Sequence, residues 1–248
     1  AAMKQVPACE YNPFEAVKTN IIGGANVIEA AIDCKVSRVL AISTDKAVNP
    51  VNLYGATKLC AEKLFVQGNS YAGDGGTIFS CARYGNVVGS RGSVIPIFKR
   101  QIANGGPVTV THPDVTRYFM TIPEAVGLVL QSFVQGKGGE IFVLDMGQPV
   151  KIVDLARQMI ELSGYRVGED IEIKFSGLKP GEKLFEELQH HTEEYAPTAH
   201  PRIMQFRGKS GVDAAALHEL EADLHGKDAN ALKRGLQRLV PEYQPHWE

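Results

Sequence analysis

The sequence lacks several features that mark specialised classes of protein. Its 248 residues include four scattered cysteines, Cys9, Cys34, Cys60 and Cys81, with no CxxC pair, which argues against a disulfide scaffold or a zinc ribbon. No apolar run approaches the roughly 18–20 residues needed to cross a bilayer. The formal net charge of −2 argues against a nucleic-acid or membrane surface. We therefore expect a cytoplasmic protein with reduced, mostly buried thiols.

A glycine-rich phosphate loop is also absent from the sequence. Gly23-Gly24 falls inside a helical pattern, and the glycines of 73–76 lie between a predicted helix and a predicted strand. A GxxGxxG loop between a strand and a helix would cradle the pyrophosphate of a dinucleotide. The histidines at 190, 191 and 200 match no common ligand spacing, so we predict no metal site.

The residues that are present alternate between helical and strand patterns. Hydrophobic residues make up 44% and charged residues 22%, as in ordinary soluble proteins. Asn12, Pro13 and Glu15 predict a capping box at the start of a helix that ends near Cys34. Strands are predicted at 36–42, buried on both faces, and at 77–83, with a helix between them at 54–68. This order favours an α/β fold with a parallel sheet.

The rest of the chain continues in the same way. Helices are predicted at 123–135, 152–163 and 184–188, and strands at 140–144 and 171–175. Two polar amphipathic helices, interpreted as a surface pair, should occupy 212–239 with a break near Gly226. We divide the chain into a nucleotide-binding part at 1–88, a substrate-binding region at 89–206 that interleaves with it, and a helical extension at 207–248.

Tyr54 and Lys58 form the strongest local chemical signal. Residues four apart near a helix start lie on one face, and an ammonium near a phenol lowers the pKa of the phenol toward working pH. Such a tyrosine can remove the proton of a sugar hydroxyl. By itself the pair is weak evidence, because YxxxK occurs by chance in many helices.

A second polar group follows the predicted strand at 36–42. Thr44, Asp45 and Lys46 stand at its carboxyl end, where open α/β sheets bind ligands. The loop at 49–52 is short enough to bring them into one site with Tyr54. The alternative interpretation of the Asp45-Lys46 pair is a solvated charge pair at a strand end.

Four sequence runs carry a resemblance to a known family. Residues 43–58, 83–96, 116–122 and 179–183, in this order, resemble UDP-N-acetylglucosamine 4,6-dehydratases of polysaccharide biosynthesis, members of the extended short-chain dehydrogenase/reductase superfamily. The similarity extends from residue 1 to about 206. It implies a partial Rossmann-like, doubly wound parallel sheet whose N-terminal strands are missing, with a smaller C-terminal α/β substrate-binding part. The sheet should then expose an apolar edge.

The resemblance also implies residue roles. Tyr54 would take the proton of the sugar C4 hydroxyl while NAD, or alternatively NADP, takes the hydride. Lys46 would remove the C5 proton, Asp45 would protonate the departing C6 hydroxyl, and Thr44 would contact the C4 hydroxyl. The remaining implied roles are cofactor binding by Tyr54, Lys58, Tyr84 and Asn86, and UDP-sugar binding by Asn86, Arg91, Arg117 and Glu182.

Several alternatives stay open at this point. A nucleotide-sugar 4-epimerase would use Tyr54 and Lys58 without needing the Asp45-Lys46 pair. A non-catalytic UDP-sugar-binding fragment would agree with the missing glycine loop. Tyr54 is usual in the shorter members of the family, whereas 110–117 and 144–149 resemble the longer members, which leaves C5 inversion and C5 retention as alternatives. We also predict a homo-oligomer.

Overall fold

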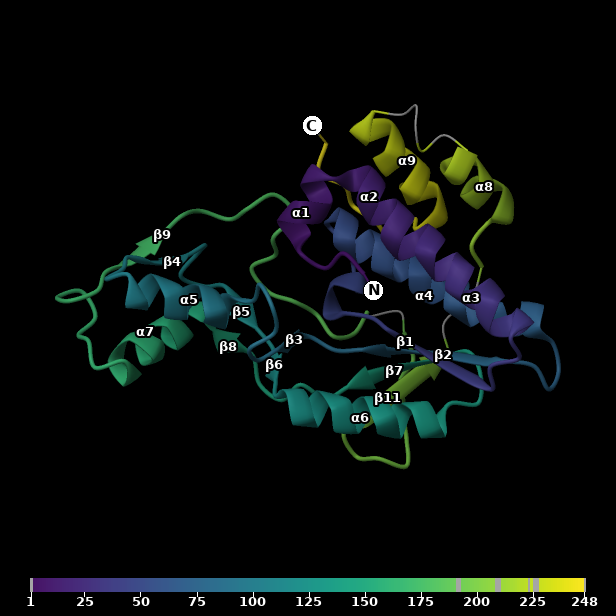
Figure 1. The fold of residues 1–248 in the computed structure, drawn as a ribbon, viewed down its shortest axis with the longest axis horizontal. Coiled ribbons are helices and arrows are strands. Elements are labelled where there is room, and N and C mark those ends of the chain that lie inside the picture. Colours follow the sequence, from purple (N-terminus) through teal and green to yellow (C-terminus); the bar gives the residue numbers. More distant parts are fainter. Residues whose placement is uncertain (1, 191–192, 208–210, 223, 225–227, 248) are drawn as a thin grey trace.

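A five-stranded sheet forms the centre of the molecule (Figure 1). The structure is a computed structural model, and it describes residues 2–190, 193–207, 211–222, 224 and 228–247. The strand order is β1-β2-β7-β11-β10. Neighbouring strands are parallel from β1 to β7, and β11 and β10 continue the sheet in antiparallel pairing. The strands are β1 Arg38–Ile42, β2 Ile78–Arg83, β7 Glu140–Leu144, β10 Ala196–Pro197 and β11 Ile203–Arg207.

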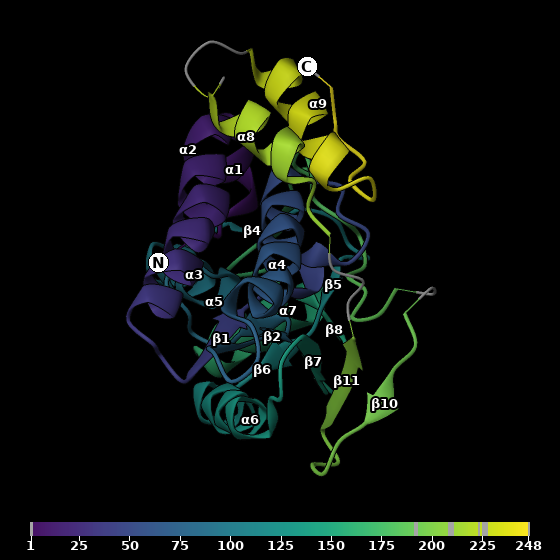
Figure 2. The same ribbon diagram turned by 90° about the vertical axis from the view of Figure 1, so that its right-hand side faces the viewer.

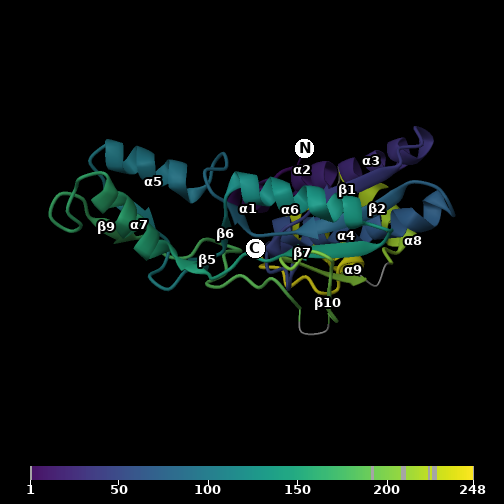
Figure 3. The ribbon, with the colours of Figure 1, turned by 90° about the horizontal axis from the view of Figure 1, so that it is seen from below.

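Helices cover both faces of this sheet, which confirms the predicted α/β class. One face carries a layer built around the long helix α4, and the other face carries α6 (Figures 1 and 3). The first layer comprises α1 Val6–Tyr11, α2 Pro13–Val17, the π-helical turn η1 Lys18–Ile22, α3 Gly23–Asp33, α4 Leu53–Ala72, α8 Ala214–Ala222 and α9 Ala229–Leu239. Helix α6 spans Ile122–Gln135 and begins with a capping box made by Thr121 and Glu124.

The predicted capping box at Asn12 is wrong, although a helix does begin at Pro13. The amide of Asn12 donates to the carbonyl of Ala8, 3.1 Å away, and makes no cap hydrogen bond. A helix not expected from the sequence, α1, precedes this position and supplies that carbonyl. The side chain of Asn12 therefore bonds to the preceding helix α1 and does not cap α2.

Strand β1 is less buried than the sequence predicts. Within the described part of the chain it pairs only with β2, and Ile42 at its end is 41% exposed. A strand at the edge of a sheet has one side without a neighbouring strand, so its side chains are less enclosed than those of a central strand. The structure thus shows the exposed apolar edge expected from the sequence.

The C-terminal helices belong to the main core and are not a surface pair. Leu232, Leu236 and Tyr243 are completely buried against the layer of α4. Helix α9 packs beside α4 (Figure 2). Their apolar faces were visible in the sequence, but their partner was not. The predicted break at Gly226 lies outside the described residues. The predicted helix at 184–188 is wrong, because that segment is a loop with bends.

A smaller lobe extends from one end of the main sheet (Figure 1). It contains α5 Val94–Ala103, α7 Ile152–Leu162 and the parallel pair β4 Val108–Val110 and β9 Ile173–Phe175. Phe98, Ile160 and Ile171 are buried in a core of its own. Short pairs connect the lobes: β3 Asn86–Val87 with β6 Phe119–Met120, and β5 Thr116–Arg117 with β8 Val150–Lys151. Strand β7 and most of β11 also come from residues 89–206, so this range contributes to both lobes.

Candidate active site

A tight turn follows β1 and carries three of the predicted site residues. Asp45–Ala47 forms a single 3-10 turn, η2, with Thr44 as its N-cap. The hydroxyl of Thr44 donates to Oδ1 of Asp45 at 2.9 Å. The amide of Asp45 donates to the carbonyl of Tyr84 at 3.1 Å, which ties the end of β1 to the end of β2. The turn therefore stands at the carboxyl edge of the sheet, where the sequence placed it.

Helix α4 begins in direct contact with this turn because residue 55 is glycine. A Cβ atom at Gly55 would lie only 2.0 Å from the carbonyl oxygen of Lys46. Asn52 caps the helix by accepting from the amide of Gly55 at 2.7 Å, and it donates to the carbonyl of Gly181 at 2.9 Å. Oε1 of Glu10 accepts from the amide of Leu53 at 2.5 Å. Three separate segments thus fix the first turn of α4, which carries Tyr54.

The ammonium of Lys46 lies at the centre of the cluster. Its Nζ is 3.0 Å from Oδ1 of Asp45, 3.3 Å from Oε1 of Glu186 and 3.4 Å from Oδ1 of Asn86. Burial opposes its charge, but the two carboxylates outweigh burial and hold the pKa of Lys46 above its ordinary value. Lys46 therefore rests as an ammonium with three oxygen acceptors.

Glu186 is a site residue that sequence reasoning missed. Its side chain is 2% exposed, and its Oε1 also lies 3.9 Å from Nε of Arg117. Burial raises the pKa of Glu186 above its usual range. The motif was interpreted only as far as Lys183, and 184–188 was predicted as a helix. The available signal was the acidic pair at 186–187, just beyond the recognised motif at 179–183.

Arg117 and Glu182, both predicted to bind substrate, are in contact with each other. Nη2 of Arg117 lies 3.3 Å from Oε1 of Glu182. The same oxygen of Glu182 accepts from the hydroxyl of Thr111 at 2.8 Å. The Arg117 side chain is 9% exposed, so this is a largely buried ion pair joining the smaller lobe to the 181–188 loop.

Tyr54 joins the cluster through Thr44 and Lys46. Burial raises the pKa of Tyr54 to about 12, and neither its hydrogen bond with Thr44 nor the ammonium of Lys46 offsets that effect. The predicted lowering of the Tyr54 pKa by Lys58 is not observed. Nζ of Lys58 instead donates to the carbonyl of Ile42 at 2.6 Å, at the end of β1, and burial lowers the pKa of Lys58.

Two further predicted residues lie apart from the hydrogen-bonded cluster. Tyr84 is half-buried, and burial raises the pKa of its phenol. Arg91 is exposed in the loop between β3 and α5. Within the described ranges, no polar contact joins the side chain of either residue to the cluster. The structure therefore brings together Thr44, Asp45, Lys46, Tyr54, Asn86, Arg117 and Glu182.

The cluster contains buried oxygens without a partner. Oδ2 of Asp45, Oε2 of Glu186 and Oγ of Ser43 make no hydrogen bond and are closed to solvent. Buried polar atoms are nearly always paired, and leaving one unpaired costs about 1–3 kcal/mol. Such atoms mark a place where a further polar group can be accommodated.

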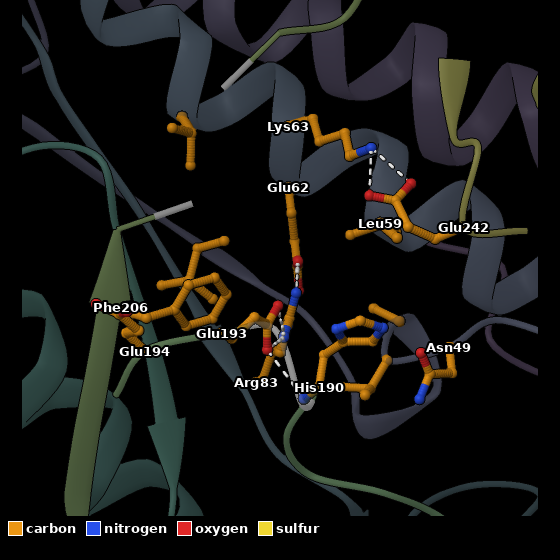
Figure 4. A pocket seen from close by; sticks show the side chains of 14 residues that line it. Asn49, Leu59, Glu62, Lys63, Arg83, His190, Glu193, Glu194, Phe206 and Glu242 are labelled. Atoms are coloured by element: carbon orange, nitrogen blue, oxygen red, sulfur yellow. Dashed lines mark hydrogen bonds and ion pairs between the residues drawn. The ribbon is translucent and has the colours of Figure 1, made fainter. Parts of the chain in front are cut away.

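A second buried charged cluster lines a cavity of about 540 Å³ on the α4 side of the sheet (Figure 4). Nε and Nη2 of Arg83 donate to the two carboxylate oxygens of Glu62 at 2.8 and 2.6 Å. Nη1 donates to Glu193 at 3.0 Å, and the guanidinium carbon lies 4.9 Å from the centre of the Phe206 ring. Each nitrogen of Arg83 has a carboxylate acceptor, so this cluster is closed.

Two kinds of feature are absent from the described residues. No helix among them is both long enough and apolar enough to span a bilayer. In the same part of the chain, histidine, cysteine, aspartate and glutamate side chains form no group of three that could hold a metal ion.

Relatives of known name share most of this chain. The capsular polysaccharide biosynthesis protein CapD of Staphylococcus aureus is 57% identical over 84% of the chain and 34% of its own length. A UDP-N-acetylglucosamine 4,6-dehydratase (inverting) of Campylobacter jejuni is 48% identical over 75% of the chain and 53% of its own. A UDP-glucose 4-epimerase of Rickettsia akari is 43% identical over 76% and 54%. The chain spans about a third to just over half of these relatives.

Solved structures agree with the fold. The X-ray structure of Pen from Bacillus thuringiensis superposes with a TM-score of 0.78 at 45% identity, covering 86% of this chain and 65% of that one. Thermus thermophilus UDP-glucose 4-epimerase, solved in complex with NAD, superposes with a TM-score of 0.64 at 22% identity, covering 76% and 67%. The family model described as polysaccharide biosynthesis protein matches residues 1–208. The chain therefore belongs to the polysaccharide biosynthesis protein family.

Proposed function

We propose that this chain carries the proton-transfer site of a nucleotide-sugar 4,6-dehydratase that acts on UDP-N-acetylglucosamine. The observation that carries the proposal is the contact of Lys46 with Asp45 beside Tyr54, within one buried cluster at the carboxyl edge of the sheet. Elimination of water needs an acid and a base close together. The Campylobacter jejuni relative, 48% identical, bears the name of this activity.

The residues divide the proton transfers as follows. Tyr54, in its phenolate form, accepts the proton of the C4 hydroxyl as that carbon gives up its hydrogen as hydride and becomes a ketone. The ketone acidifies the C5 proton, which the free amine of Lys46 removes. Asp45 takes over the proton that it shares with Lys46 in the resting site and gives it to the C6 hydroxyl, which leaves as water. The elimination leaves a double bond between C5 and C6. C6 then takes a hydride and C5 a proton, so the product is a 4-keto-6-deoxy sugar and the net change is the loss of one water molecule.

A nicotinamide cofactor fits one side of this cluster. The fit is indicated by Lys58, whose head lies at the exposed end of β1, one helical turn from Tyr54 on α4. These two residues would hold the nicotinamide ribose. NAD, when bound, supplies the hydride acceptor for C4 and the hydride donor for C6. The sequence offers no candidate loop for the pyrophosphate among its 248 residues.

The proposal is tested by incubating the full-length protein with UDP-N-acetylglucosamine and NAD and identifying the product by NMR. A 4-keto-6-deoxy product supports it, and Lys46→Met is expected to abolish that product. A C4 epimer as sole product refutes it. Binding of UDP in calorimetry without any turnover would favour the alternative of a non-catalytic UDP-sugar-binding protein.

The second candidate is a nucleotide-sugar 4-epimerase. It is favoured by the 43% identical Rickettsia akari relative of that name. An epimerase needs Tyr54 and Lys58 but no acid–base pair for elimination. Its activity would therefore survive Asp45→Asn, whereas dehydration would not.

A further inference from the structure

The three protons of the Lys46 ammonium match three acceptors in number. An ammonium has three N–H donors and no lone pair, so it cannot accept a proton. Asp45, Glu186 and Asn86 each place one oxygen within 3.4 Å of Nζ. A lysine that must act as a base is therefore held in its protonated form. One of these acceptors determines how strongly that form is stabilised.

We propose that Glu186 is a positioning residue that keeps Lys46 protonated in the resting site and sets the pH above which Lys46 can accept a proton. The inference rests on the proposed function in one respect, which is that the proton accepted by Lys46 is the C5 proton of the sugar. Its physical basis is the 3.3 Å contact between Nζ and Oε1, in which the Glu186 side chain is 2% exposed. Opposite charges at this distance, away from water, stabilise one another strongly.

Glu186 differs from Asp45 in how it reaches Lys46. Asp45 is the neighbour of Lys46 in the chain, and its Oδ1 is shared with the hydroxyl of Thr44. Glu186 arrives on the 181–188 loop, which Lys183 ties to the carbonyl of Val48 at 3.0 Å. A displacement of this loop would move the Glu186 carboxylate relative to Nζ of Lys46. Glu186 thus links the seating of the loop to the protonation of Lys46.

All charged and titratable groups around the pair enter the balance. Lys46 is faced by Asp45 from its own turn, Tyr54 from α4, Arg117 from β5 and Glu186 from the loop. Glu186 is faced by Lys46, Asp45, Arg117 and Lys183. Arg117 opposes the charge of Lys46 and is itself shared between Glu182 and Glu186. The two carboxylates of Asp45 and Glu186 outweigh the repulsion from Arg117, so the ammonium form of Lys46 is favoured.

The test is an NMR titration of Lys46 in the chain labelled with ¹⁵N and ¹³C at lysine, with Lys46→Arg used to assign the signal. In Glu186→Gln, which keeps shape but removes charge, the midpoint of Lys46 is expected to fall by about one pH unit or more. The matched control is Glu182→Gln, which removes a carboxylate from Arg117 without touching Lys46. It should leave the midpoint within a few tenths of a unit. An unchanged midpoint in a folded Glu186→Gln protein would overturn the proposal.

Two further measurements keep the proposal testable if Glu186→Gln fails to fold. Glu186→Asp retains charge on a shorter side chain and is expected to lower the midpoint by less than one unit. In the unaltered protein, the Lys46 ammonium protons should exchange slowly at neutral pH. Exchange as fast as that of an exposed lysine would contradict the inference.

The full-length enzyme separates this inference from the proposed function. The rate at which the sugar C5 proton exchanges with deuterated water reports on the protonation of the base. In Glu186→Gln, the pH at which this rate begins to rise should fall together with the Lys46 midpoint. If the Lys46 midpoint shifts but no C5 exchange occurs at any pH, the dehydratase proposal fails and the role of Glu186 stands. If C5 exchange occurs but neither its pH dependence nor the Lys46 midpoint shifts in Glu186→Gln, the proposed role of Glu186 fails and the dehydratase proposal stands.

Discussion

Two buried charged clusters lie in this molecule, and they differ in how completely they are paired. In the Arg83 cluster, every guanidinium nitrogen faces a carboxylate, from Glu62 or Glu193. In the Lys46 cluster, one oxygen of Asp45 and one of Glu186 have no partner. Removing one member of a closed cluster leaves a buried charge without its partner, whereas open oxygens cost free energy unless a ligand uses them. This difference supports the proposal that the chemistry takes place at the Lys46 cluster.

Breaking the closed cluster should have the largest effect. Arg83→Met leaves the carboxylate of Glu62 buried and unpaired, and we expect a loss of about 3–5 kcal/mol in the free energy of unfolding. Urea unfolding at neutral pH measures it. Arg166→Met, which removes an ion pair 69% exposed on the arginine side, should change it by less than about 1 kcal/mol. Equal losses in the two variants would erase the distinction between the clusters.

Gly55→Ala attacks the geometry of the open cluster. The added methyl would meet the Lys46 carbonyl oxygen at 2.0 Å, so α4 and the 45–47 turn must separate. We expect a loss of about 3 kcal/mol together with a shift of the Lys46 NMR signal. Gly127→Ala is the control, because nothing lies within 4 Å of its new methyl on α6 and alanine favours helices by about 1 kcal/mol. A Gly55→Ala protein as stable as the original would show that the close approach is not required.

The pKa of Tyr54 predicts a loss of stability at high pH. A phenol that titrates near 12 in the folded chain and near ~10 when unfolded binds its proton more tightly in the folded state. Stability therefore falls as pH rises from about 10 to 12, by about 2–3 kcal/mol for this group. Tyr54→Phe should remove that part of the fall. If the free energy of unfolding fell equally with pH in the original protein and in Tyr54→Phe, the raised pKa of Tyr54 would be contradicted.

Asp45→Asn should have the smallest effect on stability. Lys46 keeps Glu186 as a partner, and the change removes a buried charge with one unpaired oxygen. The two effects offset each other, and we expect a change of about 1 kcal/mol or less in urea unfolding. A loss matching that of Arg83→Met would show that the open cluster is as structural as the closed one.

The sequence predicted most of this fold and part of the site, for identifiable physical reasons. Local patterns located β7 and α4 because apolar runs and turn residues are local signals. The extent of burial of β1 and the burial of α9 depend on neighbours distant in the chain, which periodicity does not report. Motifs located Thr44, Asp45 and Lys46, while Glu186 needed the path of a loop that no pattern specified. The pKa of Tyr54 was mispredicted because helical spacing gives the distance to Lys58 but not the depth of burial.

The burial of α9 has a consequence for where this protein can be divided. The family match ends at residue 208, yet Lys233 on α9 forms an ion pair with Glu10 at 3.6 Å, and Glu10 holds the amide of Leu53. The unit that folds is thus longer than the range that the family model matches. A recombinant protein that ends at residue 208 would lose α9, which covers α4. Shortened versions should therefore retain residues up to at least Tyr243.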